Sequence, residues 1–162
     1  MNFEKRFALW ESSPPPELRG DPMWRLPAYR IASFLAVVCR EDAVALRRGR
    51  CTDWQIEQLK QSVDSIGANI SEGYGRLHGR DRARCYTLAL GSAREARDWY
   101  RKSAAALGED AAQGRTHLLT RAVKILTVAI PRERAGESEQ RILRAAAGRN
   151  STRSRNNREP PP

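Results

Sequence analysis

The sequence predicts an all-α protein, an antiparallel up-down four-helix bundle with flexible N- and C-terminal tails. Apolar residues recur every three or four positions in four long segments, and short connectors rich in Gly or Pro separate them. No segment shows the alternation of apolar and polar residues that is typical of a strand. We therefore expect a Pro-rich N-terminal arm at residues 1–22, the bundle at 23–131, and a basic, largely disordered tail at 132–162.

The N-terminal arm contains an extended stretch, Ser12-Ser13-Pro14-Pro15-Pro16, which blocks helix formation. Phe3, Phe7 and Trp10 precede it at helical spacing. These three aromatic residues either form a short docking helix or belong to a disordered segment. Of these, the sequence favours disorder or partial order.

The first long helix is expected at residues 27–47, because Pro27 suits a first helical turn and Gly49 follows the last apolar residue. Its apolar face consists of Tyr29, Ala32, Phe34, Leu35, Val38, Cys39, Ala45 and Leu46.

The second helix is expected at residues 53–72, with Thr52 or Asp53 as its N-terminal cap. Its apolar seam is Leu59, Val63, Ile66 and Ile70. A polar stripe lies beside this seam: Gln58, Ser62, Ser65, Asn69 and Glu72. The stripe indicates either close helix packing, which is favoured, or a ligand-binding groove.

The third helix is expected at residues 81–107, with Asp81 as N-cap and Gly108 as terminator. Its apolar side is Cys85, Tyr86, Leu88, Ala89, Ala93, Ala96, Trp99, Tyr100, Ala104 and Leu107. Gly91 in mid-helix lowers helix propensity, so a close backbone contact with a neighbour is expected there.

The fourth helix is expected to start near Ala111 or Thr116 and to stop at Pro131. Its core positions are Leu118, Leu119, Ala122, Val123, Ile125, Leu126, Ala129 and Ile130. Beyond it, residues 138–147 have the pattern of a short helix, and residues 149–162 that of a disordered basic end.

The net positive charge of the chain indicates which kinds of partner it can bind. The chain has 29 Lys and Arg against 19 Asp and Glu, a formal net charge of +10, and most of the cations are Arg. Arginine suits contacts with phosphate, so nucleic acid (RNA or DNA) is the expected partner; an acidic protein surface is an alternative. A membrane is not expected, because no apolar run approaches the roughly 20 residues that a span needs.

The cysteines and histidines predict no cofactor and no metal. Cys39, Cys51 and Cys85 are widely spaced and odd in number, and only two histidines accompany them. This pattern is typical of reduced cysteines in a cytoplasmic protein. The charged N-terminus also lacks the apolar segment of a signal peptide.

The most informative motif is Asn69-Ile-Ser-Glu-Gly-Tyr-Gly-Arg76. It predicts a helix–helix corner in which Gly73 adopts a left-handed cap. The structural residues of this corner are expected to be Asn69, Glu72, Gly73, Gly91, Ser92 and Glu95. We expect the carboxylates to join a buried hydrogen-bond network, because no nucleophile or base accompanies them, and so no catalytic site is expected.

A stripe of arginines is the candidate nucleic-acid-binding surface: Arg76, Arg80, Arg82, Arg84, Arg94, Arg97 and Arg101. The alternative is an ordinary solvated face, because Asp98 lies between Arg94 and Arg101 and can pair with either. Tyr74 can stack on a base, although packing is the commoner role of a tyrosine in a turn.

Trp24, Trp54 and Trp99 are expected to anchor the core or a subunit interface. Exposure of Trp24 or Trp54 in a single subunit would favour oligomerisation, because aromatic residues are enriched at interface centres.

The chain resembles the four-helix-bundle proteins encoded within intervening sequences of bacterial 23S ribosomal RNA genes. The residues that carry the resemblance are Gln58-Leu59, Ser65-Ile66, Asn69–Arg76 and Gly91-Ser92-Ala93-Arg94-Glu95. It spans roughly Trp24 to Pro131. The same superfamily includes the accessory variability determinant proteins of diversity-generating retroelements.

The resemblance implies an antiparallel four-helix bundle that assembles as a ring-like homopentamer with a basic exterior. Retroelement members are non-catalytic partners of a reverse transcriptase and bind nucleic acid, whereas members within ribosomal RNA genes have no settled role. Two positions depart from the family: Gln61 stands where Arg is common, and Ser71 where Ala is common. The first departure bears on a phosphate contact of the second helix.

These observations together predict a non-enzymatic, cytoplasmic, oligomeric scaffold that binds nucleic acid, with a reverse transcriptase as a candidate partner. The alternative is a protein–protein adaptor that uses its helical faces and its N-terminal arm.

Overall fold

The computed structural model describes the backbone of residues 2–156 and the side chains of residues 2–136. Every regular element in this part of the chain is helical, which confirms the predicted all-α class. The elements are α1 (Phe3–Ser12), η1 (Pro16–Leu18), η2 (Pro22–Arg25), α2 (Pro27–Arg48), α3 (Asp53–Tyr74), α4 (Gly79–Lys102), α5 (Ala104–Leu107) and α6 (Glu109–Asn156).

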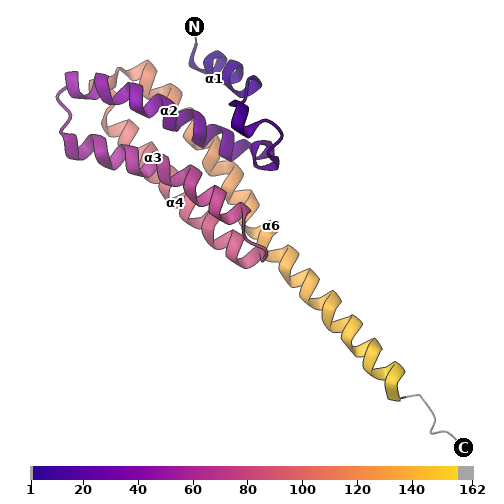
Figure 1. Ribbon diagram of the computed structural model, residues 1–162. Coiled ribbons are helices and arrows are strands. Elements are labelled where there is room, and N and C mark those ends of the chain that lie inside the picture. The colour runs from indigo at the N-terminus through magenta and orange to yellow at the C-terminus, as the bar shows by residue number, and fades with distance from the viewer. Residues whose placement is uncertain (1, 157–162) are drawn as a thin grey trace, which may run out of the picture.

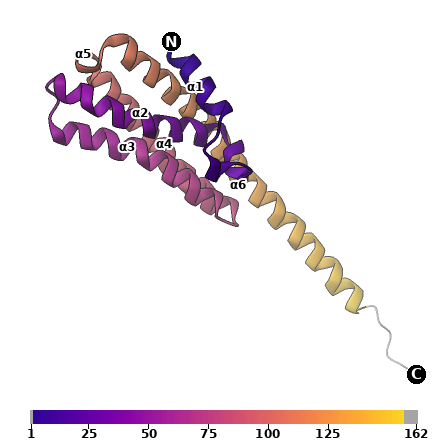
Figure 2. The ribbon, with the colours of Figure 1, turned by 45° about the horizontal axis from the view of Figure 1, so that its top comes forward.

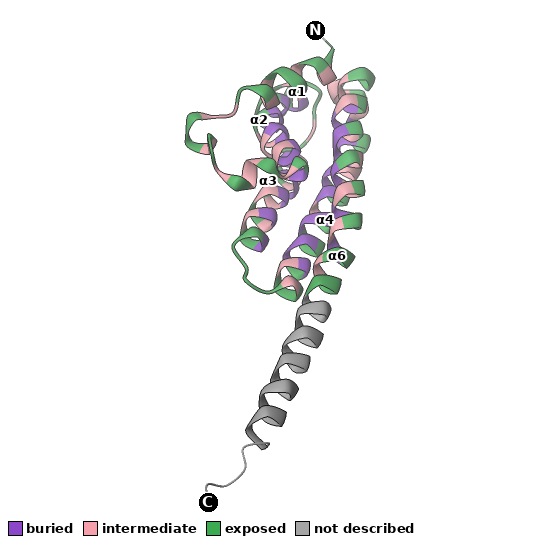
Figure 3. Cartoon of the chain, turned by 90° about the vertical axis from the view of Figure 1, so that its right-hand side faces the viewer, coloured by how far each residue is buried: buried purple, intermediate pink, exposed green. Residues whose placement is uncertain are grey.

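Four long helices surround one apolar core. α2 packs against α3 and α6, and α4 packs against α3 and the first part of α6 (Figures 1 and 2). The predicted seam of α3 is buried completely, since Leu59, Val63, Ile66 and Ile70 are each at most 1% exposed. Figure 3 shows the same division in all four helices, with buried residues on the inner faces and exposed residues outside.

The helix ends follow local chemistry. The Thr52 hydroxyl accepts from the Gln55 backbone N–H, and the Gln55 side chain accepts from the Thr52 backbone N–H, so α3 begins with a capping box. Gly108 has a φ of +96°, a conformation that favours glycine, and it separates α5 from α6. α4 begins at Gly79 after His78, so Asp81 is a first-turn residue and not the predicted cap.

The prediction of a disordered N-terminal arm is wrong for Phe3–Ser12, which form α1. Phe7 is 2% exposed, and its ring lies 5.3 Å from that of Phe34 on α2. The Arg6 guanidinium contacts both carboxylate oxygens of Glu41 at 2.7 Å. The docking-helix alternative is therefore the correct one, because burial of the aromatic rings offsets the cost of ordering the segment.

The prediction that the last helix stops at Pro131 is also wrong. The backbone of α6 is helical to Asn156, with Pro131 inside it, and Figure 1 shows it extending past the other helices. An internal proline costs about 3 kcal/mol because it removes one helical hydrogen bond. An ion pair at 2.8 Å between Arg82 of α4 and Glu133 opposes that cost by holding the next turn.

Most of the expected C-terminal tail follows Gly136, and only its backbone is described, as far as Asn156. The backbone is helical to Asn156, which agrees with the short helix expected at residues 138–147 and contradicts the disorder expected at residues 149–156. Residues 157–162, where disorder is also expected, lie outside the described residues.

Candidate functional site

α4 carries the basic face. Its inner side is narrow, since Ala83, Ala89, Ala93 and Ala96 are fully buried and let α3 and α6 approach closely. The helix contains seven basic and three acidic residues, which gives it a net charge of +4. The charged side chains are excluded from this packed side, so most of them lie on the outer face.

Two of the predicted binding residues face outward without any partner. Arg84 and Arg94 are exposed, and neither forms a hydrogen bond or ion pair with any residue that the structure describes. Ten residues separate them, which corresponds to about 15 Å along the helix axis. Arg80 is exposed on the same helix. We name Arg84 and Arg94 the open arginines; Arg80 is not one of them, because it has an interaction of its own.

Arg101 and Arg76 are exposed but locally paired. Arg101 lies 3.6 Å from Asp98, as the sequence allowed, and Lys102 approaches the same carboxylate at 2.6 Å. The hydrogen bond from Lys102 lowers the pKa of Asp98. Arg76 donates to Glu72 one turn earlier, and this bond raises the pKa of the guanidinium. Exposed pairs of this kind contribute little to stability, so an anionic ligand can compete for either arginine.

The remaining two arginines of the predicted stripe turn toward α6. Arg82 pairs with Glu133 and also donates to the backbone carbonyl of Arg76 at 2.8 Å. Arg97 is half-buried and donates to the Thr120 hydroxyl at 3.3 Å. Both therefore connect helices, and the structure does not place them with the open arginines.

The predicted corner is real as a close packing of α3 on α4, but not as a left-handed cap. Gly73 lies inside α3 and is buried. A Cβ atom there would lie 2.8 Å from the Tyr86 ring and 3.0 Å from the Cβ atom of Cys85. Glycine is needed at this position because no side chain fits between the two helices.

The buried polar network expected at this corner is absent from the described residues. Asn69 donates to the Ser65 carbonyl at 2.8 Å, within its own helix, and Glu72 is exposed beside Arg76. Glu95 is exposed and has no hydrogen-bond partner among residues 2–136. No hydrogen bond joins any two of these three side chains among the described residues.

Gly91 and Ser92 also depart from expectation. A Cβ atom at Gly91 would meet nothing within 4 Å, so no close contact within the chain explains the glycine. The Ser92 hydroxyl donates to the Leu88 carbonyl at 3.1 Å. Leu88 itself is 54% exposed and not part of the core, contrary to its predicted position.

The connection between α3 and α4 projects apolar and aromatic side chains. Leu77 is 92% exposed, Tyr74 is 40% exposed, and His78 is exposed at the cap position of α4. A cavity of about 320 Å³ adjoins this turn, lined by Glu72, Arg76, Asp81, Arg84, Cys85 and Leu88. A second group of aromatic side chains lies at the other end of α4, where Trp54 is 64% exposed and meets Trp99 edge to face.

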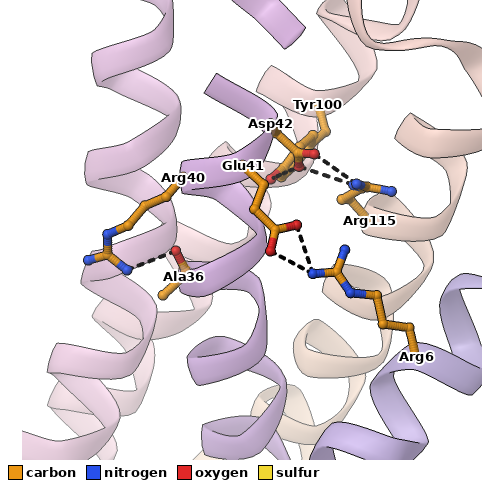
Figure 4. A network of polar contacts seen from close by, with 7 residues as sticks. All are labelled: Arg6, Ala36, Arg40, Glu41, Asp42, Tyr100 and Arg115. Atoms are coloured by element: carbon orange, nitrogen blue, oxygen red, sulfur yellow. Dashed lines mark hydrogen bonds and ion pairs between the residues drawn. The ribbon is translucent and has the colours of Figure 1, made fainter. Parts of the chain in front are cut away.

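Sequence reasoning missed a buried charged group in the core, which we name the core triad: Asp42, Tyr100 and Arg115. The Asp42 carboxylate accepts from the Tyr100 hydroxyl at 2.9 Å and from two nitrogens of Arg115, at 2.7 and 3.1 Å (Figure 4). Asp42 is 4% and Arg115 9% exposed. Burial raises the pKa of Tyr100 well above its ordinary value, so the phenol keeps its proton and donates.

The signal for this triad is present in the sequence. Arg115 precedes Leu118 and Leu119 on the apolar face of α6, and Asp42 follows Val38 by four residues on α2. A charge on a buried stripe requires an opposite charge from a neighbouring helix. The triad joins α2, α4 and α6, and its geometry is that of a structural clamp with every polar group satisfied.

We also searched the described residues for a further cavity beside the predicted site, for bonded cysteines and for a metal cluster. A cavity of about 710 Å³ lies between the start of α1 and the start of α6, and no predicted site residue lines it. The three cysteines are free thiols. Within the described residues, no cluster of three His, Cys, Asp or Glu side chains is arranged to hold a metal ion, and no helix there is long and apolar enough to cross a membrane.

Comparison with known proteins adds one match. The family model described as "23S rRNA-intervening sequence protein" matches residues 50–108, which contain α3, α4 and α5. No curated protein and no solved structure matches the chain. The matched segment includes the Asn69–Arg76 motif, the open arginines and the Gly91–Glu95 motif. The resemblance found in the sequence is thereby confirmed over this segment, which is similar to the 23S rRNA-intervening sequence protein family.

Proposed function

We propose that this chain is a non-enzymatic scaffold that assembles with copies of itself and binds nucleic acid, RNA or DNA, through the outer face of α4. We interpret α2, α3, α4 and the first part of α6 as an antiparallel up-down four-helix bundle, which holds that face rigid. The observation that carries the proposal is the pair Arg84 and Arg94, exposed and without partners in the described structure.

The physical argument is one of electrostatics. An arginine that forms no ion pair or hydrogen bond makes no polar contact between helices, yet it raises the positive potential of the surface. Phosphates of a nucleic acid neutralise such charges and release counterions, so affinity falls steeply as salt rises. An assembly would carry several copies of this face, and several weak contacts made together give a higher overall affinity than one contact alone.

Self-association has separate support. Trp54 is 64% exposed, and its ring lies 5.6 Å from that of Trp99. Exposure of this residue is the condition under which the sequence favours oligomerisation, and the family resemblance suggests a homopentamer. Light scattering tests the state: Trp54→Ala is expected to reduce the assembled mass, and a monomeric wild-type chain would refute this part of the proposal.

A titration at several salt concentrations tests nucleic-acid binding. Wild-type affinity for a labelled RNA should fall as salt rises, and Arg84→Glu/Arg94→Glu should weaken binding and flatten the salt dependence. Lys5→Glu/Lys124→Glu is the matched control, because it changes the net charge equally at exposed positions on α1 and α6. Absence of binding at low salt, or an equal loss in the control, would refute the proposal.

The biological partner follows from the family resemblance. We propose a reverse transcriptase of a diversity-generating retroelement, in the cytoplasm, as the enzyme that this scaffold accompanies. The test is genomic: a neighbouring reverse-transcriptase gene with template repeats supports this role. A location inside a ribosomal RNA gene excludes it and leaves the scaffold with another nucleic acid.

The adaptor alternative loses one of its supports. It relied on a free N-terminal arm, but α1 is packed on α2 and α6 through Phe7 and through contacts of Glu4 with Arg121 at 3.2 Å. Deletion of residues 1–22 would therefore disturb the bundle itself. Loss of a partner after such a deletion would no longer identify an adaptor surface.

A further inference from the structure

The turn between α3 and α4 exposes side chains that the fold does not use. Leu77 is 92% exposed, the highest value among the large apolar residues that the structure describes, and Tyr74 and His78 flank it in the exposed class. A single exposed leucine is ordinary. Here three apolar or flat side chains are exposed within five residues at the tip of a helical hairpin, and we name residues Tyr74–His78 the platform.

The platform is held in place from below. Arg82 donates to the Arg76 carbonyl at 2.8 Å, and the same guanidinium pairs with Glu133 of α6 at 2.8 Å. Gly73, one residue before Tyr74, is packed directly against Tyr86 of α4. The turn therefore presents its side chains from a fixed backbone, beside the point where α6 leaves the bundle (Figure 1).

Two arginines lie beside the platform. Arg76 is exposed on the turn itself, and Arg84 lines the adjoining cavity of about 320 Å³ without an ion-pair partner in the described chain. Glu72 and Asp81 also line this cavity and reduce the local positive charge. A nucleotide can bind such a surface through two contacts: its base stacks on a flat or apolar side chain, and its phosphate contacts an arginine.

We propose that residues Tyr74–His78 form a stacking platform for unpaired bases, so that the scaffold prefers single-stranded nucleic acid. The inference rests on the proposed function and adds the class of nucleic acid. Bases in a duplex are already stacked on one another and offer only edges and backbone, whereas unpaired bases expose their faces. A platform of aromatic and apolar side chains therefore discriminates between the two forms, and the open arginines do not.

The test compares two probes with the full-length protein. One is a fluorescein-labelled single strand of about 12 nucleotides, a length within the range of known single-strand sites; the other is the same strand annealed to its complement. Tyr74→Ala/Leu77→Ala should weaken binding of the single strand roughly fivefold or more, the loss expected for one stacked base. Its affinity for the duplex should stay within about twofold of wild type.

The matched control is Leu9→Ala/Val128→Ala, which removes two exposed apolar side chains on α1 and α6. It should change neither affinity. All four substituted residues are exposed, so the variants should retain the wild-type circular dichroism spectrum and melting temperature.

Three outcomes would overturn the inference. Equal losses of affinity for the single strand and the duplex would show that the turn contacts both forms of nucleic acid without preference. Unchanged binding of both probes, with a loss in Arg84→Glu/Arg94→Glu, would leave the proposed function standing and remove only the platform. Unchanged single-strand affinity, with loss of sedimentation on vesicles containing phosphatidylserine, would assign the turn to a membrane surface. Wild-type affinity in the Arg84→Glu/Arg94→Glu variant would instead refute the proposed function.

Discussion

The core triad and the open arginines place the same type of side chain in opposite situations. Arg115 is 9% exposed, and two of its nitrogens donate hydrogen bonds to the Asp42 carboxylate. Arg84 and Arg94 are exposed and have no partner in the described structure. An arginine that is buried must be paired, or its desolvation is not repaid. An arginine that is exposed and unpaired has no structural task, and so it is the better candidate for a ligand.

The largest expected effect is the loss of Asp42. Asp42→Ala should lower the free energy of unfolding by about 3–5 kcal/mol, because it leaves the charge of Arg115 buried and unpaired. Urea unfolding measures this. The adjacent Glu41→Ala is the control: its carboxylate is exposed and pairs with Arg6, so the loss should stay below about 1 kcal/mol. Equal losses of unfolding free energy in Asp42→Ala and Glu41→Ala would show that the buried ion pair contributes no more to stability than the exposed one.

A second substitution tests the close packing at the corner. Gly73→Ala should destabilise the fold by about 1–3 kcal/mol, since its Cβ atom would lie 2.8 Å from the Tyr86 ring. Thermal unfolding followed by circular dichroism measures the change. A wild-type melting temperature would mean that α3 and α4 separate easily here, and that the turn is not fixed in place.

The pH dependence reports on the core around the triad. Burial raises the pKa of Cys39 from 9.0 to about 11, so the folded chain keeps a proton that the unfolded chain releases. Stability from this thiol is complete below pH 9 and is lost as pH rises toward about 11. The loss is about 1 kcal/mol per pH unit in that window. Urea midpoints for wild type and Cys39→Ala measure it, and parallel slopes would contradict the prediction.

The smallest expected effect has the opposite sign. Gly91→Ala should stabilise α4 by about 0.5–1 kcal/mol, because a Cβ atom there meets nothing and alanine favours helix. The melting temperature of dilute protein tests this. A fall in the melting temperature would indicate that a second copy of the chain occupies the space beside Gly91.

The sequence predicted the helices better than it predicted their contacts. The seam of α3 was correct because a regular apolar period has only one buried face. Leu88 was misplaced because the buried face of α4 follows Tyr86, Ala89, Ala93 and Tyr100, and Leu88 lies outside it. The helix at Phe3–Ser12 depends on packing against Phe34, and the continuation of α6 past Pro131 depends on the ion pair with Arg82. Both partners are distant in the chain, so local helix propensity does not predict these two segments.

The candidate site shows the same limit. Spacing placed seven arginines near one another, but it did not tell which of them have partners. Arg82 and Arg97 contact Glu133 and Thr120, more than twenty residues away in the chain, and no local pattern signals these contacts. The core triad was missed for a related reason, since its members come from three helices and none is part of a motif.

The most direct test of the account measures stability and binding in one variant. Arg84→Ala/Arg94→Ala should leave the free energy of unfolding within about 0.5 kcal/mol of wild type, as expected for surface positions. Its affinity for single-stranded RNA should fall, with a salt dependence weaker by about two phosphate contacts. A variant that loses stability while it keeps wild-type affinity and salt dependence would contradict the central claim that these arginines serve binding.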